Sequence, residues 1–485
     1  MPVWNIEVQV KADSKVDKKI LTRIALVVGI FFMLICLPLH ADNDSTSKTG
    51  KSDLQELTTP AGHKFWYYPM PDAERTSLAI SWAQQVPVDG DTHPGTARLA
   101  IDLMLKGGAG GRDAAEIVAD YEDLDSGSGL WVQPRDVSGY IEAPDQHLAK
   151  AREIAQQVIT EPAFEQRWFD REHQSLIESA IEDQSKAWSS GWNLVHRVLF
   201  DNHPYEKFWS LSPIDELKSI ELSDVKKWHE ESLSTAAITI AVAGSSTPDV
   251  VAKEVDLLLA GLPSATPAKA MDFPEPVVPG KTILLHKPDA PKTQVILLGN
   301  FPAHNQDTDI PLQLGVGVLG FGQHSRLFKS VRSGLGATYG FSAGVFNFTR
   351  EHRMFEMVGE IETEQLQKVL NEIDETYTEF RTKGIGRLEF PIAKRFYKRE
   401  TTKQLKSPTS VAFTVSNALR NGFDNNYVQD LMTNIDDLGR GDTNKLISEV
   451  FPEYDQLLKV IVSPDDKAID GACVISSIDD AADCL

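Results

Sequence analysis

The feature that most constrains the fold of this chain is an internal repeat with a lag of roughly 210 residues. Each half opens with an apolar strand, expected at residues 76–84 and again at 293–298. In both halves a polar loop then leads into a helix that ends in glycine. A chain that repeats a whole set of strands and helices is expected to build the same unit twice.

The later segments of the two halves also correspond. A pair of strands is followed by two long helical segments, and each half closes on an apolar strand. The first helix, the strand pair, the two later helices and the closing strand are expected at 95–108, 130–143, 146–159, 165–200 and 236–242, and in the second half at 312–334, 339–361, 364–381, 387–421 and 457–462. The predicted class is α+β, with two homologous α/β sandwich halves, each a sheet with helices on one face, joined by a linker.

Composition sets the domain boundaries. Residues 262–280 contain five prolines and few bulky side chains, which is typical of a linker. The two halves then occupy 57–261 and 281–463, with a polar linker at 42–56 and an acidic tail at 464–485.

The N-terminal segment, residues 1–41, has the pattern of a secretory signal. Lys18, Lys19 and Arg23 precede an uncharged run of 16 residues, 24–39, and the chain then becomes polar. The sequence therefore predicts export, to the periplasm in a bacterial cell, with an uncleaved anchor in the inner membrane as the alternative. After removal of the signal only Cys473 and Cys484 remain, and the sequence leaves open whether they form a disulfide or stay as free thiols.

The formal net charge is −22, from 70 acidic and 48 basic residues. Such a charge repels nucleic acid and anionic lipid, so we expect neither as a partner. It favours basic peptides if it is focused in a cleft, although solubility alone accounts for it.

The segment 95–108 is built like a metal-binding helix without metal ligands. Arg98 and Asp102 stand four apart on one helical face, the spacing of a zinc-binding histidine pair. A guanidinium has no lone pair to donate, and one carboxylate does not replace two imidazoles. By themselves the two residues predict an intrahelical ion pair.

Four segments carry a resemblance to a known family: 95–107, 202–205, 325–328 and 331–339. They resemble the peptidase M16 family, the insulinase, pitrilysin and processing-peptidase relatives, from about Leu57 to Val462. The resemblance implies a clam-shell arrangement of the two halves. It also implies an H-x-x-E-H helix, which here holds Arg98, Ile101 and Asp102. The family's downstream acidic ligand would fall near Glu178 or Ser179, and without histidines Glu178 is expected to be a solvated helix residue or a vestige.

A second family signature is retained as Arg332 and Tyr339 in the pattern R-x-x-x-x-x-x-Y. In the family these two residues reach the substrate and the carbonyl oxygen under attack. A guanidinium and a phenol can both donate hydrogen bonds to an oxygen that gains negative charge. The structural alternative places Arg332 at a helix end and Tyr339 in a half-buried strand.

The resemblance therefore predicts the non-catalytic subunit of an exported, heteromeric M16 zinc metallopeptidase. A partner chain with H-x-x-E-H, in a heterodimer or a larger complex, would hold the zinc. This chain would hold no metal and would supply Arg332, Tyr339 and half of a chamber for unfolded peptides. The alternative is a structural or peptide-binding clam-shell protein without a proteolytic role.

Overall fold

The computed structural model describes residues 54–83, 89, 92–201, 203, 206, 208, 213–264, 275–336 and 340–485. They lie in one compact unit, Ser52–Leu485. The predicted signal segment and most of the polar linker therefore lie outside the description. Within the part of the chain that the structure describes, no helix has the length and apolar character needed to cross a membrane.

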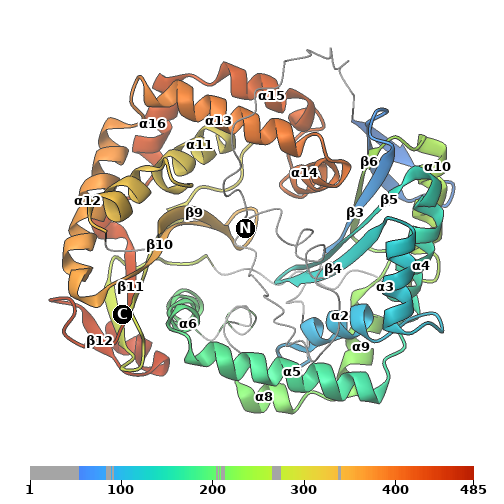
Figure 1. The fold of residues 1–485 in the computed structure, drawn as a ribbon, viewed down its shortest axis with the longest axis horizontal. Helices are drawn as coiled ribbons and strands as arrows, with labels where there is room; N and C mark the ends of the chain where they lie inside the picture. The colour runs from blue at the N-terminus through green and yellow to red at the C-terminus, as the bar shows by residue number, and fades with distance from the viewer. Residues whose placement is uncertain are drawn as a thin grey trace. The chain divides into compact units, whose positions relative to one another are not determined.

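Each half contains a mixed six-stranded sheet (Figure 1). The first has the order β1-β2-β6-β3-β5-β4, in which only β2 and β6 pair in parallel. Its strands are β1 (Gln55–Thr58), β2 (Lys64–Pro69), β3 (Arg75–Ala83), β4 (Gly127–Gln133), β5 (Asp136–Pro144) and β6 (Ile238–Gly244). The central strand β3 alternates as a two-sided strand should: Leu78, Ile80 and Trp82 enter one apolar cluster, and Ala79 enters another.

The second sheet repeats this order as β12-β7-β11-β8-β10-β9. Its strands are β7 (Thr282–His286), β8 (Thr293–Phe301), β9 (Phe341–Asn347), β10 (Arg353–Ile361), β11 (Leu458–Ser463) and β12 (Cys473–Ile475). Strand β7 pairs in parallel with both β11 and β12, and the remaining pairs of this sheet are antiparallel. The repeat predicted from the sequence is thus present in five strands of each sheet, whereas the outer strands β1 and β12 come from opposite ends of the described chain and pair in opposite senses.

Helices cover the outer face of each sheet. The first half contains α2 (Thr96–Lys106), α3 (Ala114–Asp123), α4 (Leu148–Thr160), α5 (Gln166–Ser185), α6 (Ala187–Phe200), α8 (Ile214–Lys218), α9 (Leu222–Ser232) and α10 (Pro248–Leu259). The second half contains α11 (Asp309–Gly320), a π-helical segment η3 (Phe328–Gly334), α12 (Leu366–Lys383), α13 (Glu389–Gln404), α14 (Pro408–Arg420), α15 (Tyr427–Asp437) and α16 (Arg440–Val450). Short 3₁₀ turns are η2 (Asp145–His147), η4 (Thr363–Gln365), η5 (Tyr454–Gln456) and η6 (Ile478–Cys484). The predicted α+β class, with a sheet and helices in each half, is confirmed.

The inner face of each sheet is covered by a helix from the other half. Helix α6 packs on β8 and β11, and α14 packs on β3 and β6 (Figure 1). Small residues permit both approaches. On the first sheet, Ala79, Ala241 and Ala243 face α14. On α6, a Cβ added at Gly191 would lie 2.9 Å from Ile296 of β8, so only glycine fits without a shift.

Three helices predicted as continuous are interrupted. The segment 312–334 breaks after Gly320, where the backbone comes so close to Ala343 of β9 that no side chain fits. The segment 165–200 breaks at Lys186, whose extended backbone (ψ 133°) starts α6 toward the second sheet. The segment 387–421 breaks before Pro408, where Ser407 caps α14 and accepts a hydrogen bond from the Ser410 amide.

The residues after Pro464 complete the second sheet. Strand β12 pairs in parallel with β7, and η6 packs against α6. Cys473 and Cys484 form a disulfide, which is one of the two alternatives that the sequence left open. Arg197 of α6 also forms an ion pair with Asp479 at 3.3 Å. The acidic tail is therefore a structural part of the second half.

The packing of α14 yields a stability prediction. Ala241→Leu adds three carbons at a fully buried position against α14, so it should lower the free energy of unfolding by about 1–3 kcal/mol. Urea unfolding measures this. The matched control is Val250→Leu on α10, where the side chain is 46% exposed and the change should be small. Equal stabilities for the two variants would contradict the close packing of α14.

Candidate functional site

The N-terminus of helix α2, the helix without metal ligands, is capped by nearby residues. Gly95 adopts a positive φ of 91° at the N-cap position, a conformation that favours glycine. Asp89 supplies the side-chain acceptor: its carboxylate accepts hydrogen bonds from the amides of Ala97 at 2.8 Å and Gly95 at 3.4 Å. Burial raises the pKa of Asp89 to about 6, although these two hydrogen bonds act in the opposite direction.

The three positions at which the family carries H-x-x-E-H have different surroundings. Ile101 is 5% exposed and belongs to the apolar core of the first half. Asp102 is half-buried and forms an ion pair with Lys106 at 2.9 Å, one turn further along α2. Arg98 is also half-buried, and its Nε is buried without a hydrogen-bond partner among the described residues.

The predicted ion pair between Arg98 and Asp102 is therefore wrong. Lys106 competes successfully because it bridges two acids: its Nζ lies 2.9 Å from Asp102 and 3.0 Å from Glu172 of α5. Burial lowers the pKa of Lys106, but the charges of Asp102 and Glu172 outweigh it and hold the pKa above its ordinary value. This network, which the sequence analysis missed, occupies the place where a metal ligand pair would need free lone pairs.

The expected downstream acid does not reach this network. Glu178 is exposed and accepts a hydrogen bond at 3.0 Å from Gln174 of its own helix. It is thus the solvated helix residue that the sequence analysis expected, and Ser179 beside it is half-buried. Among the described residues no group of three or more His, Cys, Asp or Glu side chains could hold a metal ion.

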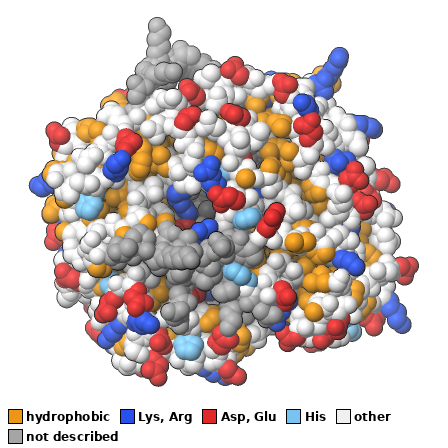
Figure 2. Space-filling view, turned by 180° about the vertical axis from the view of Figure 1, so that it is seen from behind, with side chains coloured by type: hydrophobic (Ala, Val, Ile, Leu, Met, Phe, Trp, Pro, Cys, Tyr) orange, Lys and Arg blue, Asp and Glu red, His pale blue; other side chains and the backbone are white. Residues whose placement is uncertain are grey.

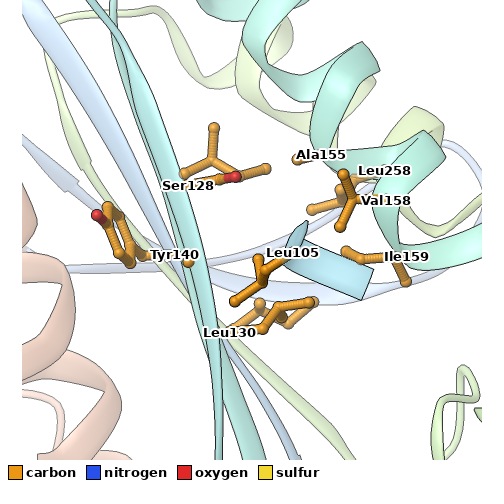
Figure 3. Close-up of a pocket in the computed structure, with 11 residues that line it drawn as sticks. Leu105, Ser128, Leu130, Tyr140, Ala155, Val158, Ile159 and Leu258 are labelled. Carbon is orange, nitrogen blue, oxygen red and sulfur yellow. The ribbon is translucent and has the colours of Figure 1, made fainter. Parts of the chain in front are cut away.

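Next to α2 lies β4, the edge strand of the first sheet. A small pocket lies against one face of β4 and is lined by Leu105, Leu130, Val158 and Ile159 (Figure 3). The pocket is almost wholly apolar. Its polar side chains are Ser128, which donates a hydrogen bond to the Tyr121 hydroxyl at 2.7 Å, and Tyr140, so it lacks the convergent set of polar groups that orients a ligand.

The other face of β4 carries an aromatic cluster. The ring centroids of Trp131 and Tyr140 lie 6.5 Å apart, and Phe413 of α14 lies 5.6 Å and 6.0 Å from them. Tyr140 fits because its neighbour is Gly129, where an added Cβ would approach the ring to 2.7 Å. An edge strand beside such a cluster can accept an extended peptide through its free backbone groups.

The second predicted site lies around η3. Arg332 is exposed in the last turn of this segment, with its guanidinium carbon 5.3 Å from the centroid of the Phe328 ring. Its carbonyl accepts the Gly336 amide at 3.0 Å, as at a helix end. Tyr339 lies outside the described residues, as do Asn202, Pro204 and Tyr205, so the pairing of Arg332 with Tyr339 remains a prediction.

Glu356 on β10 is a buried acid that sequence reasoning missed. It is 9% exposed, and its Oε2 has no hydrogen-bond partner in the described structure. It faces Gly344 of β9, where an added Cβ would lie 2.8 Å from Oε1. Burial raises the pKa of Glu356 to about 7. The only sequence signal was a glutamate on a strand with apolar neighbours.

Strand β9 contains a serine in a sequence pattern that resembles that of a catalytic nucleophile. Residues 340–344 read G-F-S-A-G, the pattern of a nucleophile elbow. Ser342, however, lies within β9, is exposed and pairs with Val358 of β10. The motif therefore lacks the strand-turn-helix geometry that its chemistry requires.

Comparison with known proteins agrees with this architecture. Residues 219–397 match the family described as Peptidase M16 inactive domain. No curated protein sequence matches the chain significantly. The match confirms the predicted resemblance to the peptidase M16 family, and it includes Arg332 but not α2.

Three solved structures show the same fold. The peptidase M16 inactive domain from Pseudomonas fluorescens has a TM-score of 0.73 at 18% identity, over 85% of this chain and 98% of that one. A protease from Helicobacter pylori has a TM-score of 0.68 at 17% identity, over 85% and 100%. The periplasmic protease PqqL from Escherichia coli has a TM-score of 0.71 at 14% identity, over 94% of this chain and 49% of PqqL. This chain thus aligns with about half the length of PqqL.

The ion network in α2 predicts that histidines alone will not rebuild a zinc site. We expect Arg98→His/Asp102→His to retain well under one zinc per chain after dialysis. Two imidazoles fall short of the three ligands that a catalytic zinc needs, Glu178 is exposed, and Glu172 is held by Lys106. Elemental analysis measures the metal, and circular dichroism checks the fold. One tightly bound zinc per chain would show that we have misjudged this site.

Glu356 predicts a pH dependence of stability. Its carboxyl holds a proton in the folded state up to about pH 7, whereas in the unfolded state the proton leaves near 4.5. The stabilisation that this group contributes is therefore complete below pH 4.5 and is lost as the pH rises through 7. The loss is at most about 3 kcal/mol.

The test compares the free energy of unfolding of wild type and Glu356→Gln from pH 5 to pH 8. The free energy of unfolding of Glu356→Gln should rise relative to that of wild type as the pH increases. Glu375→Gln on α12 is the control, because Glu375 is exposed and forms no ion pair within the described structure, so its replacement should leave the pH profile unchanged. Parallel profiles for wild type and Glu356→Gln would contradict the burial argument.

Proposed function

We propose that this chain, which has an M16-like fold and an M16 inactive domain, is the non-catalytic subunit of an exported, heteromeric M16 zinc metallopeptidase. The observation that carries the proposal is a contrast between its two halves. Helix α2 is intact, but Arg98, Ile101 and Asp102 provide no metal site. In the second half Arg332 is exposed on η3, and the resemblance to the family implies that this residue binds substrate.

In the proposed complex the partner chain carries H-x-x-E-H, and with it the zinc and the general base. This chain contributes Arg332 and Tyr339, whose guanidinium and hydroxyl donate hydrogen bonds to the carbonyl oxygen of the peptide under attack. That oxygen gains negative charge in the transition state, so donors placed beforehand lower the barrier. Removing one such donor typically costs about 3 kcal/mol in the transition state.

Unfolded peptides are the proposed substrates. Edge strand β4 offers unpaired backbone groups to an extended chain, and Trp131, Tyr140 and Phe413 provide an apolar surface beside it. The net charge of −22 would favour basic peptides only if the acidic side chains were focused at the site where the peptide binds. In the space-filling view, acidic side chains are spread around the visible face instead of gathering in one patch, so a solubility role accounts for part of this charge (Figure 2).

Export is the proposed localisation. The disulfide between Cys473 and Cys484 is of the kind that persists in oxidising compartments such as the periplasm. The N-terminal pattern of basic and apolar residues supports the same proposal.

Two measurements test the proposal. Purification of the tagged chain from its native host should recover a stable complex with an M16 chain that carries H-x-x-E-H, and the isolated chain should neither contain zinc nor cleave peptides. A lone homodimer or an unrelated partner would favour the alternative, a structural or peptide-binding protein. Stoichiometric zinc in the isolated chain, with activity lost on chelation, would contradict the proposal directly.

The role of Tyr339 has its own test. In the assembled complex, Tyr339→Phe should lower kcat by about 100-fold or more while leaving assembly unchanged, because it removes one hydrogen-bond donor and keeps the ring. Tyr68→Phe, on β2, is the matched control and should leave kcat unchanged. If turnover by Tyr339→Phe equals that of wild type, the residue has only a packing role.

A further inference from the structure

Helix α13 carries an apolar surface that no described residue covers. Leu388, Ile392 and Phe396 repeat every four residues and are 86%, 65% and 40% exposed. Phe321, at the end of α11, is 62% exposed, and its ring centroid lies 6.4 Å from that of Phe396. We call these four residues the α13 face. Four exposed apolar side chains in one place are more typical of an interaction site than of free surface.

The charges around the α13 face are opposite to those of the chain as a whole. Residues 387–403 carry six Lys or Arg and two Glu, in a chain with a net charge of −22. Arg387 and Arg395 are exposed and form no ion pair within the described structure. The other cations are engaged locally; Lys398, for example, pairs with Asp436. The α13 face therefore fits a partner surface on which carboxylates flank apolar side chains.

The α13 face is also tied to the segment that leads to Arg332. Arg326 donates two hydrogen bonds to the Glu389 carboxylate at the start of α13, at 3.1 and 2.6 Å. A third goes to the carbonyl of Gly384 at 2.8 Å. Arg326 lies two residues before the start of η3, so these hydrogen bonds join the first turn of α13 to the segment that carries Arg332. A chain bound at α13 would thus be held next to the element proposed to complete its site.

We propose that the α13 face is the docking surface for the partner chain that carries H-x-x-E-H, and that the partner presents an apolar ridge flanked by Asp or Glu. This inference rests on the proposed function. A second copy of this chain is a poorer occupant, because two α13 faces in contact would bring Arg387 and Arg395 of both copies together. Like charges in an interface oppose association.

The test uses the full chain and each M16 chain with H-x-x-E-H encoded by the same genome, purified separately and titrated against it. We expect Ile392→Lys/Phe396→Lys to weaken binding by at least about 100-fold, because it removes the centre of the apolar contact and adds charge. Arg387→Glu/Arg395→Glu should weaken binding by about tenfold at low salt and by less at high salt.

Matched controls are Val118→Lys/Val250→Lys and Lys226→Glu/Lys253→Glu, on other exposed helical surfaces of the first half. Both should bind within about twofold of wild type. Circular dichroism melting confirms that every variant is folded.

The outcomes separate the two proposals. If an H-x-x-E-H chain binds and the α13 variants bind it as tightly as wild type, the docking surface is wrong and the proposed function stands. If no such chain binds, the proposed function fails and this inference fails with it. Self-association of wild type that the α13 variants abolish would assign the surface to a second copy and overturn the inference.

Discussion

The structure depends on the exchange of two helices between its halves. A six-stranded sheet with an apolar inner face is not stable against water, and each half covers that face with a helix from the other half. Alanines on β3 and β6 let α14 approach the first sheet, and Gly191 lets α6 approach the second. The contact between Arg420 of α14 and the buried Asp136 of β5 adds a charged link between the halves. Neither half is complete alone, so changes in one half are expected to affect the stability of the other.

This interdependence explains why a helix without metal ligands is retained. Helix α2 contributes Leu99, Leu103 and Met104 to the core of the first half, and all three are fully buried. Loss of the metal ligands costs the fold little as long as the freed positions are occupied by compatible side chains. The pairing of Lys106 with Asp102 and Glu172 does this, because the one ammonium group partly neutralises both carboxylates. A scaffold can thus lose its chemistry without losing its packing.

Sequence periodicity predicted the repeat, the fold class and most strands because each half buries apolar residues on regular faces. It failed where tertiary contacts decide. Lys186 ends α5 because the chain must cross to the second sheet, and nothing local signals this. Gly320 ends α11 because β9 lies against it. The break before Pro408 was also missed, although Ser407 and Pro408 are a local signal for a helix start.

The site shows the same division. That Arg98 and Ile101 cannot ligate a metal follows from residue types alone, since chemistry restricts which side chains donate electron pairs. The partner of Asp102 did not, because Arg98 and Lys106 are equally spaced from it and only the position of Glu172 on another helix decides between them. The buried state of Glu356 likewise depends on Gly344 across the sheet. Spacing along a helix therefore identifies candidate pairs, and contacts between elements select among them.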